Sequence, residues 1–265
     1  MHRALRGIRP QVFAHRGGAG LGPENTLEAF DRGMAAGADG IECDVRLARD
    51  GAVVVMHDPT VDRTTDGRGP VRSLTSAELA RLDAAHRYRE GDGFPLRGRG
   101  VGVPTLREVL ARYPQAAVIV ELKEPAPELA HRVVDAIREV DALERVVVGS
   151  FSRPALRAIR RYEPRLPTGS SREEARLALY ATRVGIAPHW AGYRAIQVPE
   201  RSRGTRIVST RFIRLAHQAG LVVQVWTVDE ADDIRRLLLW GVDAIISDRP
   251  DVAVRTLQEW SAVGR

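Results

Sequence analysis

The chain has 265 residues, of which 44% are hydrophobic, and its 40 Lys and Arg exceed its 34 Asp and Glu by six charges. These charges are interspersed and aromatic residues make up only 5%, which argues against a nucleic-acid-binding surface of basic patches and stacking rings. A single cysteine, Cys43, excludes an internal disulfide and a cysteine-based zinc site.

No apolar stretch of the sequence approaches the roughly 20 residues that a membrane span requires. The basic N-terminal segment lacks the apolar core of a secretory signal. We therefore expect a cytoplasmic protein without stable membrane insertion, folded as one domain over residues 1–265. The sequence does not indicate an oligomeric state.

Short apolar runs alternate with segments of helical periodicity along the chain. The runs that predict buried strands are residues 11–15, 40–45, 116–122, 145–151, 166–170, 194–199, 222–228 and 243–248. Each is followed by a segment that fits a helix or a helix-containing connection. Eight such units in a chain of this length predict an α/β fold, a TIM (β/α)8 barrel.

Capping residues mark the starts of several predicted helices. The expected N-caps, each with a glutamate three residues later, are Asn25 with Glu28, Thr105 with Glu108, and Ser170 with Glu173. A further helix is expected to start after Asp229 as its cap and to end at Gly241.

The second unit is irregular. Asp50 and Gly51 read as a hairpin turn, and residues 52–57 read as a return strand. Residues 59–104 are rich in Gly, Arg and Pro, and we interpret them as an insertion with one short helix from Thr75, lying over the active-site end of the barrel.

Charged side chains stand where a barrel strand should be apolar. Residues at i and i+2 of a strand share a face, so Glu42 points the same way as Asp44, and Glu121 the same way as Lys123. At the ends of adjacent strands, the three carboxylates would converge and repel one another unless a cation lay between them. Oxygen ligands favour Mg²⁺ or Ca²⁺ over Zn²⁺.

Two histidines, His15 and His57, also fall at predicted strand ends, where they can act as general acid and base beside a bound phosphate. Lys123 is the only lysine of the chain, which suggests a local need for an ammonium group rather than a guanidinium group. Its expected partner is a phosphate oxygen or a nearby carboxylate. The other five histidines are expected to be structural or surface residues.

Several motifs together resemble the glycerophosphodiester phosphodiesterase family, over residues 11–257. They are AHRG at 14–17, PENT at 23–26, GIECDVRLARDG at 40–51, VVMHDPTVDRTTDG at 54–67, PTLREVL at 104–110, VELK at 120–123 and the stretch from 222 to 251. One departure is TVDE at 227–230, where many relatives have TVN.

The resemblance implies metal-dependent hydrolysis of a small-molecule phosphodiester to glycerol 3-phosphate and an alcohol. It implies one divalent cation, Mg²⁺ or Ca²⁺, held by Glu42, Asp44 and Glu121. His15 and His57 are then the acid–base pair. It further implies that Arg16 and Lys123 contact the phosphate and that Trp226 forms a wall of the substrate pocket.

Three alternatives stay open. The same site would serve a lysophospholipase D-like or sphingomyelinase D-like enzyme acting on a lipid, although the polar, Arg-rich insertion argues against a long acyl chain. A non-catalytic protein that binds nucleic acid or anionic lipid is a second alternative. Another metal-dependent TIM-barrel hydrolase is a third, but the His-x-His spacing of the amidohydrolase type is absent after the first predicted strand.

Overall fold

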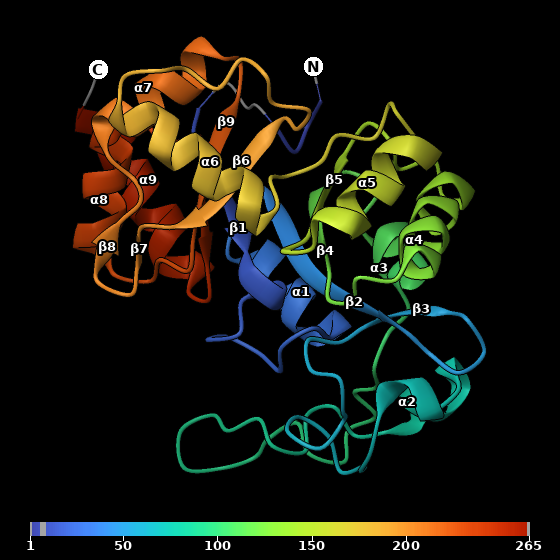
Figure 1. Ribbon diagram of the computed structural model, residues 1–265. Helices are drawn as coiled ribbons and strands as arrows, with labels where there is room; N and C mark the ends of the chain where they lie inside the picture. Colours follow the sequence, from blue (N-terminus) through green and yellow to red (C-terminus); the bar gives the residue numbers. More distant parts are fainter. Residues whose placement is uncertain (1, 6–8, 264–265) are drawn as a thin grey trace.

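The computed structural model describes residues 2–5 and 9–263, and its centre is a parallel sheet curved into a barrel (Figure 1). Within these residues the strands follow the order β5-β4-β2-β1-β10-β9-β6 around the barrel, and the neighbours in this order are parallel. The strands are β1 (Gln11–Ala14), β2 (Gly40–Leu47), β3 (Val53–Val55), β4 (Ala117–Leu122), β5 (Val146–Gly149), β6 (Ala195–Pro199), β7 (Arg201–Ser202), β8 (Thr205–Arg206), β9 (Val222–Trp226) and β10 (Ala244–Ser247). The predicted TIM barrel is confirmed.

The barrel closes between β5 and β6 through a short extended segment, where the sequence predicts a full strand over residues 166–170. In place of that strand the described chain has two isolated parallel bridges, Val148 to Thr168 and Gly169 to Ala195. Pro167 has no amide hydrogen to donate and glycine is a poor strand former, so this stretch does not support a longer ladder.

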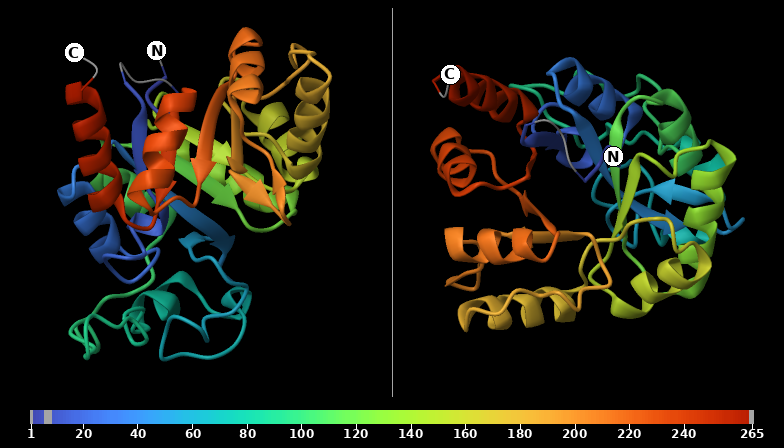
Figure 2. Two further views of the ribbon diagram at one scale, coloured as in Figure 1. Left: turned by 90° about the vertical axis from the view of Figure 1, so that its left-hand side faces the viewer. Right: turned by 90° about the horizontal axis from the view of Figure 1, so that it is seen from above.

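Helices cover the outside of the barrel, as the view from above in Figure 2 shows. One helix, α2 (Ser76–Arg81), lies away from the barrel wall in the segment after β3. The helices around the barrel are α1 (Leu27–Ala35), α3 (Leu106–Arg112), α4 (Pro127–Glu139), α5 (Arg153–Tyr162), α6 (Arg172–Arg183), α7 (Thr210–Gln218), α8 (Ala231–Trp240) and α9 (Pro250–Val263). Each presents an apolar stripe to the strands. In α4, for example, Leu129, Val133 and Ile137 are fully buried.

Some predicted caps are confirmed. Thr105 forms a capping box with Glu108, and Gly241 ends α8 in the left-handed conformation with φ of 90°. The cap of α1 is Thr26 and not Asn25, and the cap of α6 is Ser171 and not Ser170.

The prediction that Asp229 caps α8 is also wrong, because its carboxylate accepts hydrogen bonds from Ser247 Oγ and the Asp248 amide, each at 2.8 Å. Asn25, Ser170 and Asp229 all lie beside the site described below. Thr26 and Ser171 cap α1 and α6 instead, whereas the N-cap residue of α8, Glu230, makes no capping hydrogen bond through its side chain.

The inside of the barrel is filled by apolar side chains that include Phe13, Ile119, Val147 and Ile246. The N-terminal end is closed by the start of the chain, where Gln224 Nε2 donates a hydrogen bond of 2.9 Å to the carbonyl of buried Ala4. This closure leaves the carboxyl ends of the strands as the accessible end of the barrel.

The second unit contains the predicted hairpin. Gly51 adopts φ of 78° in the turn, and β3 pairs antiparallel with β2. Residues 59–104 follow, with α2 capped by Thr75 as predicted. In Figure 1 this segment lies at the bottom, beyond β2 and β3, and it packs on the hairpin through a small apolar cluster that includes Val54, Met56, Val61 and Leu79.

None of the helices in residues 2–5 and 9–263 combines the length and apolar character that crossing a bilayer requires.

Candidate active site

A cavity of about 820 Å³ opens at the carboxyl ends of the barrel strands. His15 directly follows β1, and Trp226 is the last residue of β9. The residues predicted for the site that line the cavity are His15, Arg16, Glu42, His57, Glu121, Lys123 and Trp226. The eighth, Asp44, is fully buried beside them.

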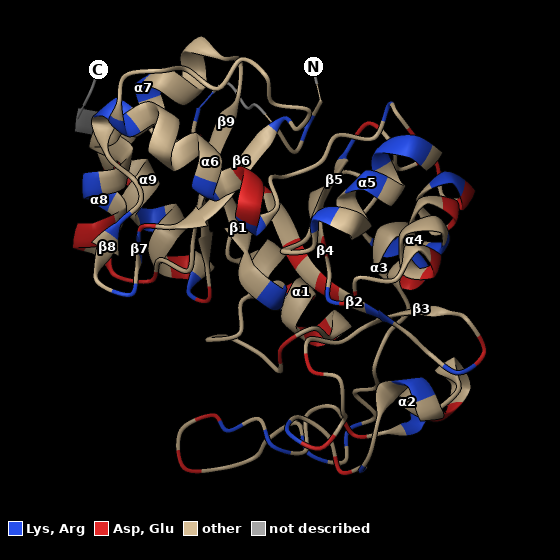
Figure 3. Ribbon diagram, in the orientation of Figure 1, with Lys and Arg blue, Asp and Glu red and all other residues tan. Residues whose placement is uncertain are grey.

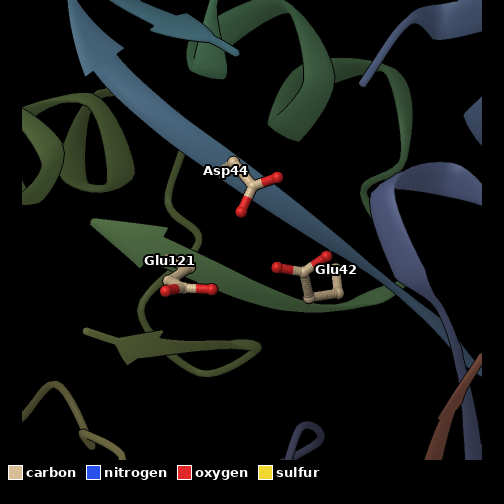
Figure 4. Close-up of side chains that lie close together, drawn as sticks. All are labelled: Glu42, Asp44 and Glu121. Carbon is tan, nitrogen blue, oxygen red and sulfur yellow. The ribbon is translucent and has the colours of Figure 1, made fainter. Parts of the chain in front are cut away.

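Three carboxylates meet at the inner end of this cavity. Glu42 and Asp44 alternate on β2, and Asp44 lies in register with Glu121 on the adjacent strand β4. One oxygen from each residue lies within 4.8 Å of the others. Figure 4 shows the three side chains directed toward one another, and Figure 3 shows the acidic positions within β2 and β4.

The three carboxylates differ in their pKa values. Burial, together with the charge of Asp44, raises the pKa of Glu42 to about 7, and burial raises the pKa of Glu121. Burial also opposes ionisation of Asp44, but Lys123 and Arg16 outweigh it and lower the pKa of Asp44. A positive charge near Glu42 would oppose the effects of burial and of Asp44 and would lower the pKa of Glu42.

Lys123 and Arg16 supply the nearest cations. Lys123 Nζ lies 2.9 Å from Asp44 Oδ1 and 3.0 Å from Glu121 Oε2. Arg16 Nε lies 3.2 Å from Asp44 Oδ2, and Arg16 Nη1 donates to Glu24 Oε1 at 3.0 Å. Both cations therefore contact carboxylates, and both also line the cavity.

The donor set fits a divalent metal ion. Three carboxylates face two cations, and Glu121 Oε1 is buried without a hydrogen-bond partner among the described residues. Carboxylate oxygens are the ligands that Mg²⁺ and Ca²⁺ prefer. A cation bound between Glu42, Asp44 and Glu121 would give the unpartnered oxygen of Glu121 a positively charged partner.

His15 is held by a residue from the other end of the chain. Its Nδ1 lies 2.7 Å from Asp248 Oδ1, and its Nε2 lies 3.9 Å from Glu42 Oε2. Burial lowers the pKa of His15, but the hydrogen bond to Asp248 and the charge of Glu42 outweigh burial, so the pKa is raised.

His57 is held in a similar way. Its Nδ1 lies 2.7 Å from Asp58 Oδ1, while Arg46 donates two hydrogen bonds to the His57 carbonyl at 3.0 and 2.8 Å. Because an aspartate binds Nδ1 of each histidine, Nε2 is the ring nitrogen left for a substrate in both.

Sequence reasoning missed several supporting residues. Asn25 has φ of 59° and forms two hydrogen bonds with Asp44, one to the carboxylate at 2.9 Å and one from the Asp44 amide at 3.1 Å. Arg63, from the segment after β3, contacts both Asp58 and Glu24. Asn25 stands in PENT and Arg63 in VDRTTDG, so the motifs contained these residues but not their roles.

Trp226 forms part of the cavity wall together with Phe151. Their rings are 5.9 Å apart at 80°, an edge-to-face contact. Of the segment 59–104, all of which the structure describes, no residue lines the cavity.

The fold and the position of the cavity place the protein among the TIM-barrel enzymes, whose active sites lie at the carboxyl ends of the strands. The model of the glycerophosphoryl diester phosphodiesterase family matches residues 15–252, and the chain belongs to this family. The resemblance and the enzyme class inferred from the sequence motifs are thereby confirmed.

Known relatives match over nearly their whole length. A glycerophosphodiester phosphodiesterase of Caldanaerobacter subterraneus subsp. tengcongensis is 34% identical, with 95% of this chain and 99% of the relative covered. The crystal structure of a glycerophosphodiester phosphodiesterase from Agrobacterium tumefaciens has a TM-score of 0.75 at 29% identity, covering 92% of this chain and 99% of that one.

A phosphodiesterase of Oleispira antarctica, solved in complex with the product sn-glycerol-3-phosphate, has a TM-score of 0.72 at 26% identity. The match covers 95% of this chain and 98% of that one.

Proposed function

We propose that the chain hydrolyses glycerophosphodiesters to glycerol 3-phosphate and an alcohol, with a divalent cation held by Glu42, Asp44 and Glu121. The observation that carries this proposal is the convergence of three carboxylates, two cations and two histidines at one end of a single cavity. The product bound by the Oleispira antarctica relative supports glycerol 3-phosphate as one of the two products.

The phosphate lies against Arg16 and Lys123 in this proposal. An ammonium group has three donors, and the contacts of Lys123 with Asp44 and Glu121 leave one for a phosphate oxygen. When bound, a divalent cation would add positive charge that stabilises the charge developing on the phosphate oxygens. The pairing of Lys123 with two carboxylates fixes the direction of its third donor.

His15 and His57 move the protons. One takes a proton from the nucleophile, whose oxygen forms a new bond to phosphorus, and the other gives a proton to the alcohol oxygen as its bond to phosphorus breaks. The nucleophile is water or the 2-hydroxyl of the glycerol; the second route passes through a cyclic phosphate that water then opens. Asp248 and Asp58 orient the two rings.

The test measures glycerol 3-phosphate released from glycerophosphocholine, glycerophosphoethanolamine and glycerophosphoglycerol with Mg²⁺, with Ca²⁺ and with EDTA. Release that EDTA abolishes and a divalent ion restores is the expected result. Release that persists in EDTA would contradict the metal role, and no release from any of the three would contradict the substrate class.

A lipid substrate is the second candidate, favoured by apolar side chains at the cavity. Phe151 and Tyr180 line it and are 44% and 57% exposed, and buried Leu179 lies beside them. The polarity of the insertion does not bear on this alternative, since residues 59–104 stay outside the cavity wall. Hydrolysis of lysophosphatidylcholine in preference to glycerophosphocholine would establish it.

A further inference from the structure

The cavity extends beyond the carboxylates along helix α6 and the β7–β8 hairpin. We call this extension the α6 arm, and its lining residues are Ser170, Arg172, Arg176, Leu179, Tyr180 and Arg203. A glycerol phosphate group is small compared with a cavity of about 820 Å³, so the arm is available to the other alcohol of the substrate.

The α6 arm is positively charged. Arg172, Arg176 and Arg203 form no ion pair with a carboxylate of the described residues, whereas Arg160, on α5, forms one with Glu174 at 2.7 Å. Arg172 and Arg176 are one turn apart on α6, so both lie on the same face of the helix. Arg172, Arg176 and Arg203 add three positive charges to the lining of the arm, and an anion bound there would offset these charges.

Acidic residues do not neutralise the arm. Among the described residues that line the cavity, the acidic ones are Glu42 and Glu121, and both lie at the end with the three carboxylates. Glu173 and Glu174 stand in the first turn of α6, where red positions are visible in Figure 3, but they do not belong to the cavity lining.

A buried hydroxyl adds a second, independent observation. Ser170 is 7% exposed and lines the cavity, and its Oγ has no hydrogen-bond partner among the described residues. It directly precedes Ser171, the N-cap of α6, at the positive end of a 12-residue helix. A hydroxyl in this position is free to donate to an anion.

The same features disfavour a cationic alcohol such as choline. An aromatic ring can bind a cation, but the guanidinium group of Arg172 already lies 5.1 Å from the ring centre of Phe151. A quaternary ammonium group in the arm would therefore face like charges without a carboxylate to offset them.

We propose that the α6 arm binds a second phosphate group, carried by the leaving alcohol of the diester. Ser170, Arg172, Arg176 and Arg203 are its contacts, and they select substrates whose leaving alcohol is anionic over those whose leaving alcohol is cationic. The inference rests on the proposed function and names the class of substrate for the same site.

The experiment compares three diesters that share the glycerol phosphate half: glycerophosphoglycerol, the same compound with a phosphate on its second glycerol, and glycerophosphocholine. We expect kcat/KM for the phosphate-bearing diester to be about tenfold above that for glycerophosphoglycerol, since a few partly exposed charge contacts act together. We expect glycerophosphocholine to be the poorest substrate. Raising the salt concentration should narrow the preference.

The variant Arg172→Gln/Arg176→Gln/Arg203→Gln should lose the preference through a higher KM for the phosphate-bearing diester. The matched control is Arg183→Gln/Arg211→Gln/Arg214→Gln, which removes the same charge from exposed positions of α6 and α7 outside the cavity. The control should keep the preference for the phosphate-bearing diester. This comparison separates the effect of contacts in the arm from the effect of a lower net charge.

Equal kcat/KM values for the three diesters, or a preference that survives in the α6 arm variant, would overturn this inference and leave the proposed function standing. Cleavage of none of the three diesters would overturn the proposed function and this inference with it.

Discussion

The Nζ atom of Lys123 lies 2.9 Å from Oδ1 of Asp44, a carboxylate with no exposed surface. The same ammonium group lies 3.0 Å from Glu121 Oε2, so the only lysine of the chain bridges the two strands that carry the acidic residues. The burial of Lys123 opposes its charge, but these two carboxylates outweigh burial and raise its pKa.

Lys123→Arg should reduce kcat/KM by about 100-fold, because a planar guanidinium group is larger than an ammonium group and cannot occupy the same point between two carboxylates without displacing them. The measurement is glycerol 3-phosphate release under saturating metal. Arg183→Lys, the reverse exchange at an exposed position, is the control and should keep wild-type activity. Unchanged activity in Lys123→Arg would mean that the choice of lysine has no functional basis.

Removing one carboxylate should weaken metal binding. We expect Mg²⁺ or Ca²⁺ to raise the melting temperature of the wild-type protein, because a ligand that binds the folded state stabilises it, and Glu121→Gln to lose most of this rise. Glu139→Gln is a matched control, since Glu139 is exposed and lies in α4, outside the cavity. An equal rise in wild type and Glu121→Gln would exclude Glu121 as a ligand.

Each histidine should be required for turnover. His15→Ala and His57→Ala should each lower kcat at least about 100-fold on a diester of an ordinary alcohol. A diester with a nitrophenolate leaving group needs no protonation, so it should restore activity to the variant that lacks the general acid and not to the other. His189→Ala, at a position outside the cavity, should behave as wild type. Near-normal kcat in both site variants would refute the acid–base assignment.

Asp58 should contribute a pH-dependent part of the stability. Burial raises its pKa, but hydrogen bonds from Arg63 and His57 outweigh burial and lower the pKa to about 2, below the ordinary value of 3.8. A lowered pKa in the folded state means that the contribution is complete above the ordinary pKa and is lost as the pH falls through about 2.

Asp58→Asn should therefore reduce the free energy of unfolding by about 1 to 2 kcal/mol at pH 7, a value that allows for partial solvent screening. Urea unfolding measured at several pH values should show the difference narrowing as the pH falls below 4. Asp92→Asn, at a fully exposed position, should differ little from wild type throughout. A difference that is the same at every pH would mean that the ion pairs of Asp58 do not stabilise the fold.

The sequence alone predicted the barrel, and it singled out eight residues that the structure brings together at one cavity, because most of the signals involved are local. Alternation along a strand puts Glu42 and Asp44 on one face whatever the rest of the chain does, and runs of Val and Ile mark buried strands. The prediction of helix caps failed where two neighbouring residues could both serve as the cap. Both Asn25 and Thr26 are good helix caps, and only the nearby Asp44 decides that Asn25 turns inward.

What the sequence by itself determined is most of the barrel strands, their faces and the chemical types that their ends carry; it did not determine that residues 166–170 form only isolated bridges. The tertiary structure alone decided which aspartate holds His15, since Asp248 lies 233 residues away along the chain. It likewise decided that Arg63 joins Asp58 to Glu24, and that unpaired arginines of α6 and the β7–β8 hairpin face one cavity. Such contacts depend on how the barrel closes. The local sequence around each of two residues does not show how far apart their side chains lie when the residues are distant along the chain.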